Sequence, residues 1–412
     1  MHRHLPRLAA AWLAACLVAG AAAQPVADDP QAPLRAQLAR IEALRTQRPG
    51  DGVLVYYQAM TLARLDRRND ALAALRSLTG RRLGIVPTAG MGFDALWQDA
   101  EFSALREQLS ADEPRTPDAP RALHLADPAL IPEGIAHDAE TKRFFIGSVA
   151  RHKIVVVDAR GRARDFSRPG DRLDAVLGLH VDAKRRVLLA VSTNAFEDSG
   201  KTALRNAVLR YPLNDPRRVQ RLDAPAAQQL NDVVAAPDGT LFATDSASGS
   251  LLRAAPGATL LEPFGQRGAL LGANGIAVAP DGSLFVTLST GIARVNPADG
   301  SFQRLPQPDQ VVTGGIDGLY WHDGDLVGVQ NVTIAGRVIR IHLADAGRRI
   351  GGITVLQSHH HPDFDEPTTG TIAGVTLVTI ANSQVARYQA DGSLREPATL
   401  KAPQLIAVPL RR

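Results

Sequence analysis

Cysteine is nearly absent from this chain of 412 residues, because Cys16 is the only one. No disulfide can therefore form within the chain, and its stability must come from a packed core. Aromatic residues make up only 5% of the sequence. No segment reaches the roughly 18 consecutive apolar residues of a membrane-spanning helix, so we expect none. The net charge is +4, with basic residues scattered among acidic ones, which argues against nucleic-acid binding.

The first 23 residues have the pattern of a secretory signal peptide. Arg3 and Arg7 precede an apolar run over 8–18, and Ala21-Ala22-Ala23 supplies the small residues of a cleavage site before Gln24. We therefore expect an exported protein, periplasmic or extracellular. As an alternative, the stretch ending in Cys16 resembles a lipoprotein attachment site, which would anchor the chain at that cysteine.

Helical patterns fill most of 24–109. Apolar residues recur at helical spacing over 34–44, 53–67, 70–78 and 93–109. The stretch 57–78 is similar to one tetratricopeptide unit, and stacked units of that kind normally number about three. Two interpretations follow: a module that binds a protein partner, or a helical cap packed on the main domain.

Residues 110–120 contain three prolines and no apolar anchor, so we interpret them as a linker. From residue 121 onward the pattern changes to short strands. Segments 231–246 and 274–289 are identical at nine of sixteen positions, and the spacing of 43 residues recurs from Asn274 to Asp317.

Strand-built repeats of ~40–50 residues are typical of a propeller, with one four-stranded blade per repeat. We predict an all-β six-bladed β-propeller over 121–412, with a small α-helical N-terminal region. Either 121–126 or 402–410 can supply the strand that closes the ring. Asp-Gly pairs at 238–239, 281–282 and 323–324 fit tight hairpins, in which glycine takes a positive φ. Alignment gives six equivalent positions, one per blade: Glu133, Leu177, Asn231, Asn274, Asp317 and Thr368.

Equivalent positions of a propeller converge on its axis, so Glu133, Asn231, Asn274 and Asp317 are expected to meet. Two carboxylates and two amide oxygens form a hard ligand set that favours Ca²⁺, with Mg²⁺ or Mn²⁺ as alternatives. The alternative is that these residues only satisfy local backbone groups at strand starts. Glycine follows three of the four and is expected to let the backbone turn sharply there, whereas Asp232 follows the fourth.

The series Glu133-Gly134, Asn231-Asp232, Asn274-Gly275 and Asp317-Gly318 resembles the family of gluconolactonase, regucalcin (senescence marker protein) and luciferin-regenerating enzyme. The resemblance covers roughly 125–390. It implies a six-bladed propeller with a divalent metal in its central channel, and hydrolysis of lactones or related esters.

By this resemblance the metal ligands are Glu133, Asn274 and Asp317. Asn231 is the asparagine that contacts substrate, and its oxygen also belongs to the predicted metal set. Asp317 is the first candidate for the base that accepts a proton from water. The family's sugar lactonases carry arginine two residues before the substrate asparagine, where this chain has Gln229, so a sugar substrate is in doubt.

Other candidates lie outside the repeat. His359, His360 and His361 precede the sixth blade on the same face as the metal ligands, so they are expected either to bind substrate or to form an exposed loop. His137 and His180 lie early on inner strands, where buried structural histidines are the simpler interpretation. The leading function is metal-dependent hydrolysis of a lactone or ester. The alternative is a non-enzymatic, exported propeller that binds a ligand or protein and uses the metal structurally.

Overall fold

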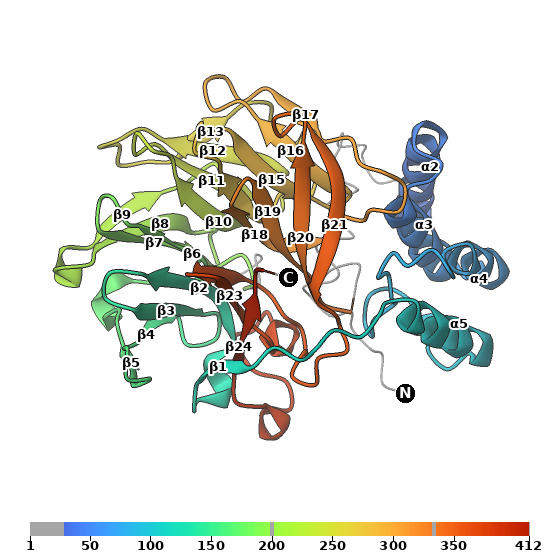
Figure 1. The fold of residues 1–412 in the computed structure, drawn as a ribbon, viewed down its shortest axis with the longest axis horizontal. Helices are drawn as coiled ribbons and strands as arrows, with labels where there is room; N and C mark the ends of the chain where they lie inside the picture. The colour runs from blue at the N-terminus through green and yellow to red at the C-terminus, as the bar shows by residue number, and fades with distance from the viewer. Residues whose placement is uncertain (1–28, 198–201, 332–334, 412) are drawn as a thin grey trace.

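The structure is a computed structural model, and it describes residues 29–197, 202–331 and 335–411. The signal peptide and Cys16 lie outside the described residues. Among the described helices none is long and apolar enough to cross a membrane. Figure 1 shows strands arranged as blades of a ring, with the helices gathered at one side of it.

Six four-stranded antiparallel sheets form the ring, which confirms the predicted six-bladed propeller. In each blade the strands run in the following order from the inner to the outer one. Blades 1 to 3 are β2 (Pro132–Asp138), β3 (Arg143–Ser148), β4 (Lys153–Val157), β5 (Ala163–Asp165); β6 (Ala175–Asp182), β7 (Val187–Thr193), β8 (Asn206–Pro212), β9 (Gln220–Asp223); and β10 (Leu230–Ala235), β11 (Leu241–Asp245), β12 (Ser250–Ala254), β13 (Glu262–Phe264). Blades 4 to 6 are β14 (Ile276–Val278), β15 (Leu284–Leu288), β16 (Gly291–Val295), β17 (Phe302–Arg304); β18 (Ile316–His322), β19 (Asp325–Gln330), β20 (Arg337–Ala344), β21 (Arg349–Gln357); and β22 (Gly370–Ala373), β23 (Thr376–Ile380), β24 (Gln404–Pro409), β1 (Arg121–His124).

Both chain segments that could close the ring take part in the sixth blade. β24 pairs with β23, and β1 adds to β24 as the outermost strand. Strands from the two ends of the propeller thus share one sheet. The three predicted Asp-Gly hairpins also have the expected conformation, because Gly239, Gly282 and Gly324 all have positive φ.

The helical region consists of α2 (Ala32–Gln47), α3 (Gly52–Arg64), α4 (Arg68–Arg76) and α5 (Ala100–Ala111). The last helix is shorter than the predicted 93–109 pattern at its start, because a 3-10 turn at Asp94–Leu96 precedes it. Asp99 then accepts hydrogen bonds from the N–H groups of Glu101 and Phe102 and begins the helix there. One pair of helices, α3 and α4, covers the stretch that resembles a tetratricopeptide unit, and that likeness stays a prediction.

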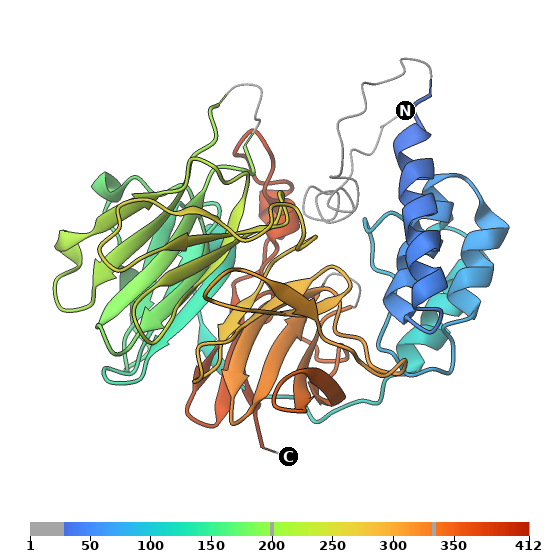
Figure 2. The ribbon, with the colours of Figure 1, turned by 90° about the horizontal axis from the view of Figure 1, so that it is seen from above.

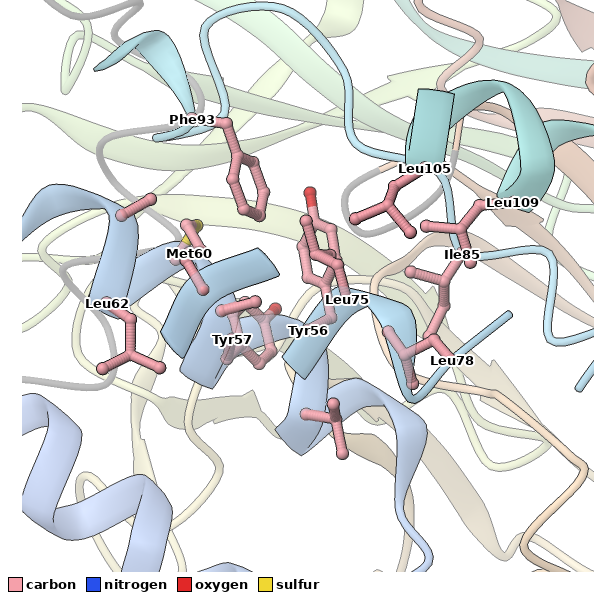
Figure 3. Close-up of a cluster of buried hydrophobic side chains, with 14 of the residues drawn as sticks. Tyr56, Tyr57, Met60, Leu62, Leu75, Leu78, Ile85, Phe93, Leu105 and Leu109 are labelled. Carbon is pink, nitrogen blue, oxygen red and sulfur yellow. The ribbon is translucent and has the colours of Figure 1, made fainter. Parts of the chain in front are cut away.

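Side chains from α3, α4, α5 and the segment before α5 form a single apolar cluster (Figure 3). The cluster also includes Val312, which lies in the loop that leads into β18. Tyr57 of α3 donates a hydrogen bond to the carbonyl oxygen of Ser289, just after β15, at 3.3 Å. The helices therefore contact the propeller at the loop that follows the second strand of blade 4 and at the loop that enters the inner strand of blade 5. Figure 2 shows the helices beside the ring.

The segment predicted as a linker is held to the propeller at a few points, and most of its other residues are exposed. α5 continues through Ala111, Glu113 is 3% exposed and Ala119 is 6% exposed. Thr116 accepts a hydrogen bond from the side-chain amide of Gln357 at 2.9 Å. Few apolar residues are available to hold this segment, so buried polar contacts do so instead.

Candidate functional site

The inner strands of four blades depart from regular pairing at the position that the repeat predicts to face the axis, and one of them is blade 2, where the shift lies between Val176 and Leu179 and the position is the apolar Leu177. The pairing register shifts between Pro132 and Ile135 in blade 1, and between Leu230 and Val233 in blade 3. Blade 5 has the same shift between Ile316 and Leu319. A β-bulge of this kind re-aims side chains and is common beside functional sites. The four bulges carry Glu133, Leu177, Asn231 and Asp317, so three of the four predicted ligands lie on a bulge.

The residue after the axis-facing position is glycine in four blades: Gly134, Gly178, Gly275 and Gly318. A Cβ atom on Gly134 would overlap the carbonyl oxygen of Leu177 in the next blade, and one on Gly275 would overlap that of Asp317. None of the four has a positive φ. A left-handed backbone is therefore not the reason for glycine at these positions. They are small because neighbouring inner strands touch here.

In the other two blades, the residue at this position uses its side chain to bind the adjacent inner strand. Asp232 of blade 3 accepts a hydrogen bond from the N–H of Ile276 at 3.3 Å. Thr369 of blade 6 donates one to the carbonyl oxygen of Glu133, and Thr368 donates another at 3.2 Å. All six inner strands are thus in contact around the axis at the level of the predicted site.

These contacts predict an unequal response of two glycines to the same substitution. Gly134→Ala is expected to lower the free energy of unfolding by at least about 1–3 kcal/mol, because the new methyl group meets backbone that has no room to move. Gly170→Ala is the control, since a Cβ there meets nothing within 4 Å and its φ is not positive. Urea unfolding of both variants measures the difference. Equal stability of the two would contradict close contact between the inner strands.

Glu133 and Asp317 lie in this ring as buried carboxylates, 6% and 7% exposed. Burial raises the pKa of Asp317 to about 6, although hydrogen bonds from Asn331 and Asn274 oppose the rise. Burial raises the pKa of Glu133 well above its usual value, and the charges of Asp317 and Asp232 raise it further. Glu133, Asn274 and Asp317 therefore share one environment, whereas among the described residues no hydrogen bond joins Asn231, the fourth predicted ligand, to any of them.

Asp232 is a third acid in the same electrostatic environment. Burial raises its pKa to about 7, and the charge of Asp317 adds to the rise. Its two oxygens accept hydrogen bonds from the N–H groups of Val233, at 2.8 Å, and Ile276. Because both oxygens bind backbone groups, we assign Asp232 to the wall of the site and not to a ligand set. Its role was missed from the sequence, although it is the one acid at a position otherwise held by glycine or threonine.

The residue that follows the second strand supports the site residue in two blades. In blade 3, the Asn231 side-chain amide donates to the Ser246 hydroxyl at 2.9 Å. In blade 5, the Asn331 side-chain amide donates to Asp317 Oδ2 at 2.6 Å. Asn331 was also missed from the sequence, although it lies 14 residues after Asp317, much as Ser246 lies 15 after Asn231.

Tyr320 is a further residue that sequence reasoning did not select. Its hydroxyl accepts a hydrogen bond from the N–H of Gly370 at 2.6 Å, which links blades 5 and 6. Burial raises its pKa well above the usual value, and the charges of Asp232, Asp317 and Glu133 contribute. The phenol therefore lies within the field of all three acids. The available signal was an aromatic residue at an inner-strand position where blades 3 and 4 have Val234 and Ala277.

The histidines before the sixth blade contact the linker segment. His359 Nδ1 lies 3.1 Å from Glu113 Oε2, His360 Nε2 lies 3.0 Å from the Glu113 carbonyl oxygen, and His361 Nε2 lies 3.0 Å from that of Ala119. His360 also lines a cavity of about 740 Å³ between the helical region and blade 5, which none of the predicted metal ligands lines. We therefore do not carry these three histidines forward as substrate contacts.

The remaining histidines are placed on inner strands, as expected. His180 lies on β6, and burial lowers its pKa to about 4. His137 packs against Phe144 in a tilted arrangement with ring centroids 4.5 Å apart, and burial lowers its pKa as well. Both rings are therefore neutral at pH 7, and no contact joins either one to Asp317 in the part of the chain that the structure describes.

The acid cluster can be tested for its fit to a divalent cation. Glu133 Oε2 is buried and has no hydrogen-bond partner. Within the described residues, no ion pair joins Glu133, Asp232 or Asp317 to a basic side chain, and only burial, one another and neutral donors set their pKa values. A buried negative charge without a partner is costly, and a bound cation offsets that cost.

The donor types also suit a hard cation. Over the described ranges, no group of three or more His, Cys, Asp or Glu side chains is arranged to hold a metal ion. A ligand set here therefore needs the amide oxygens of Asn274 and Asn231 beside the two carboxylates. The side-chain amide of Asn274 donates to Asp317 and that of Asn231 donates to Ser246, so these contacts use the NH₂ groups and not the amide oxygens. Carboxylate and amide oxygens are the ligands that Ca²⁺ prefers.

The raised pKa values predict how the stability of the metal-free protein depends on pH. Acids whose pKa is raised by folding bind more protons in the folded state, so the free energy of unfolding falls as pH rises from about 4 to above 7. The loss is on the order of a few kcal/mol for a shift of about two units. Urea unfolding with chelator at pH 5 and pH 8 measures it.

Comparison with a variant isolates the acid cluster in this experiment. His137 and His180, whose pKa values are lowered, contribute the opposite slope below about pH 6.5. Glu133→Gln keeps both histidines and removes one buried acid, so its stability should fall less between pH 5 and 8. An identical fall in the wild type and the variant would show that Glu133 is not an uncompensated acid.

Comparison with known proteins adds no functional assignment. No family model matches the chain, and no curated protein matches it. Among solved structures, the chain is similar to a PQQ-bound aldose sugar dehydrogenase from Streptomyces coelicolor, with 14% identity, 72% of this chain and 97% of that chain covered, and a TM-score of 0.48. It is also similar to a gluconolactonase from Xanthomonas campestris, with 14% identity, coverage of 72% and 99%, and a TM-score of 0.45.

A third solved structure is virginiamycin B lyase from Staphylococcus aureus, with 17% identity, coverage of 62% and 80%, and a TM-score of 0.44. The names of these three proteins include a dehydrogenase, a lactonase and a lyase. At such identities and scores, none of these activities transfers to this chain. What this propeller does is therefore inferred from its own residues.

Proposed function

We propose that this chain is a metal-dependent hydrolase of a lactone or ester, with Ca²⁺ as the cation in the central channel. The observation that carries the proposal is the ring of inner strands that brings Glu133, Asn274 and Asp317 together as buried oxygen donors, with Glu133 Oε2 unpartnered. Such a set has an excess of negative charge and no basic side chain paired with it among the described residues.

In this proposal Glu133, Asn274 and Asp317 hold the cation. When bound, a divalent cation supplies a Lewis acid that polarises a carbonyl oxygen. Asn231, fixed by Ser246, presents its amide oxygen to a substrate hydroxyl or to the cation. Asp317 is the first candidate to accept a proton from the attacking water, because its buried carboxylate would lie beside a water held at the cation.

A second candidate function rests on where the donors come from. Glu133, Asn274 and Asp317 belong to blades 1, 4 and 5, so a cation on them would tie three blades together whether or not a substrate binds. A binding propeller with a structural cation therefore uses the same residues. The hydrolase turns over a lactone or ester, whereas the binding propeller does not.

Hydrolysis of a panel of aliphatic, aromatic and sugar lactones by the full chain, with Ca²⁺ and with chelator, tests the proposal. We expect chelator-sensitive turnover of at least one class, with the sugar lactones weakest because Gln229 stands where arginine serves the sugar lactonases that the chain resembles. A protein that Ca²⁺ stabilises but that turns over no lactone would support the binding propeller instead.

A further inference from the structure

The helical region reaches the candidate metal site through a continuous chain of buried contacts in blade 5. Arg337, at the start of β20, is 1% exposed, and its guanidinium Nη1 donates to Glu113 Oε1 at 2.8 Å. Arg337 Nε donates to the side-chain oxygen of Gln330, the last residue of β19, also at 2.8 Å. Gln330 is completely buried. The linker that follows α5 is thus tied to the end of β19.

Gln330 in turn holds the segment that leads into the inner strand. Its side-chain amide donates to the carbonyl oxygens of Val312, at 3.2 Å, and Gly314, at 2.8 Å. It also pairs directly with Ile316, the residue before Asp317. One buried side chain therefore fixes β19 against both the linker and the approach to Asp317.

The next residue, Asn331, makes the contact with the site. Its N–H donates to the Gly315 carbonyl oxygen at 3.3 Å. Its side-chain amide donates to Asp317 Oδ2 at 2.6 Å and to the Pro367 carbonyl oxygen at 2.7 Å. Both partners are acceptors, so the amide can only present its NH₂ group to them. A hydrogen bond to a carboxylate is among the stronger ones and fixes its orientation.

We propose that Asn331 is a positioning residue for the carboxylate of Asp317, and that the buried chain Glu113–Arg337–Gln330 makes the linker of the helical region part of the cation site. This inference rests on the proposed function, since it assigns a role toward the same cation. Partners of this kind orient metal ligands, and their loss typically costs 10–100-fold in metal affinity. The helical region then serves the site in addition to any partner that it binds.

Calcium affinity, measured by isothermal titration on the full chain, tests the inference without requiring turnover. Asn331→Ala is expected to raise the dissociation constant at least about 10-fold. Gln330→Leu keeps the side-chain volume but removes the link to Arg337, and it is expected to raise the dissociation constant for calcium several-fold. Gln357→Leu is the matched control. Gln357 is also buried in blade 5 and binds the linker, through Ala119 and Thr116, but has no contact with Asn331.

The control should lose stability in urea while keeping wild-type calcium affinity. Wild-type affinity in Asn331→Ala would overturn the positioning role. If Asn331→Ala binds calcium more weakly while Gln330→Leu keeps wild-type calcium affinity, the linker plays no part in the site. If Gln330→Leu does not fold, the calcium affinity of Glu113→Gln is measured instead. That variant removes the charge at the linker end of the contacts Glu113–Arg337–Gln330 and so tests the same role of the linker. A wild type that binds no calcium refutes the proposed site itself, and this role with it.

Discussion

Asp317→Asn is expected to stabilise the metal-free protein and at the same time abolish its activity. The substitution keeps the shape of the side chain and an oxygen for Asn331 to bind, and the Asn274 amide can turn so that its oxygen accepts from the new NH₂ group. It removes a buried charge that no basic side chain among the described residues offsets. At pH 8 the gain should be on the order of 2–3 kcal/mol in the free energy of unfolding with chelator present. Chelator-sensitive turnover should fall by at least about 10³-fold.

Thermal unfolding with and without Ca²⁺ tests whether stabilisation by the cation requires Asp317. Wild type should be stabilised by Ca²⁺, and Asp317→Asn should not respond. Asp281→Asn is the matched control, since Asp281 lies in an exposed hairpin of blade 4 with a side chain 61% exposed. If Asp317→Asn is less stable than wild type in chelator, Asp317 makes a favourable contact in the metal-free fold, and the carboxylate is then not an uncompensated charge.

The second large effect is expected where the helical region meets blade 5. Glu113 and Arg337 form an ion pair with side chains only 2% and 1% exposed. Burial raises the pKa of Glu113, but the hydrogen bonds and charges of His359 and Arg337 outweigh burial and hold it below its usual value. Removing Arg337 leaves the buried Glu113 with His359 as its one remaining partner among the described basic side chains, so Arg337→Met is expected to cost about 3 kcal/mol.

A double-mutant cycle separates the pair from its surroundings. Glu113→Gln combined with Arg337→Met should recover much of the loss, because neither charge is then left alone in the interior. Urea unfolding followed by tryptophan fluorescence reports on the contact, since Trp97 lies in the helical region and packs against its apolar cluster. Additive losses in the double variant would show that the pair does not hold the helical region to the propeller.

The fold was predictable because its repeat is local and regular. Segments 231–246 and 274–289 each carry an inner strand, an Asp-Gly hairpin and a second strand, and the 43-residue spacing places Asn274 and Asp317 at the same point of successive blades. The position that faces the axis follows from this spacing alone. The bulge at that position, and the contact between inner strands that makes Gly134 necessary, are properties of the closed ring and are not visible in one repeat.

The remaining site residues could not be predicted because they depend on contacts between segments far apart in the chain. Asp232 binds the backbone of the next blade, and Tyr320 binds that of Gly370. Glu113 meets Arg337 across 224 residues of sequence. The loop containing His359 suggested a site because of its composition, whereas the structure places it against the linker. Residue type alone does not distinguish these two environments.

Anomalous diffraction from crystals grown with Mn²⁺, used as a stand-in for Ca²⁺, tests the proposed cation site most directly. We predict an anomalous peak on the propeller axis, within about 2.0–2.6 Å of oxygens from Glu133, Asn274 and Asp317. In crystals of Asp317→Asn grown in the same way, that peak should be missing. A protein that hydrolyses a lactone in a chelator-sensitive reaction, yet holds its cation away from these three side chains, would contradict the proposed site.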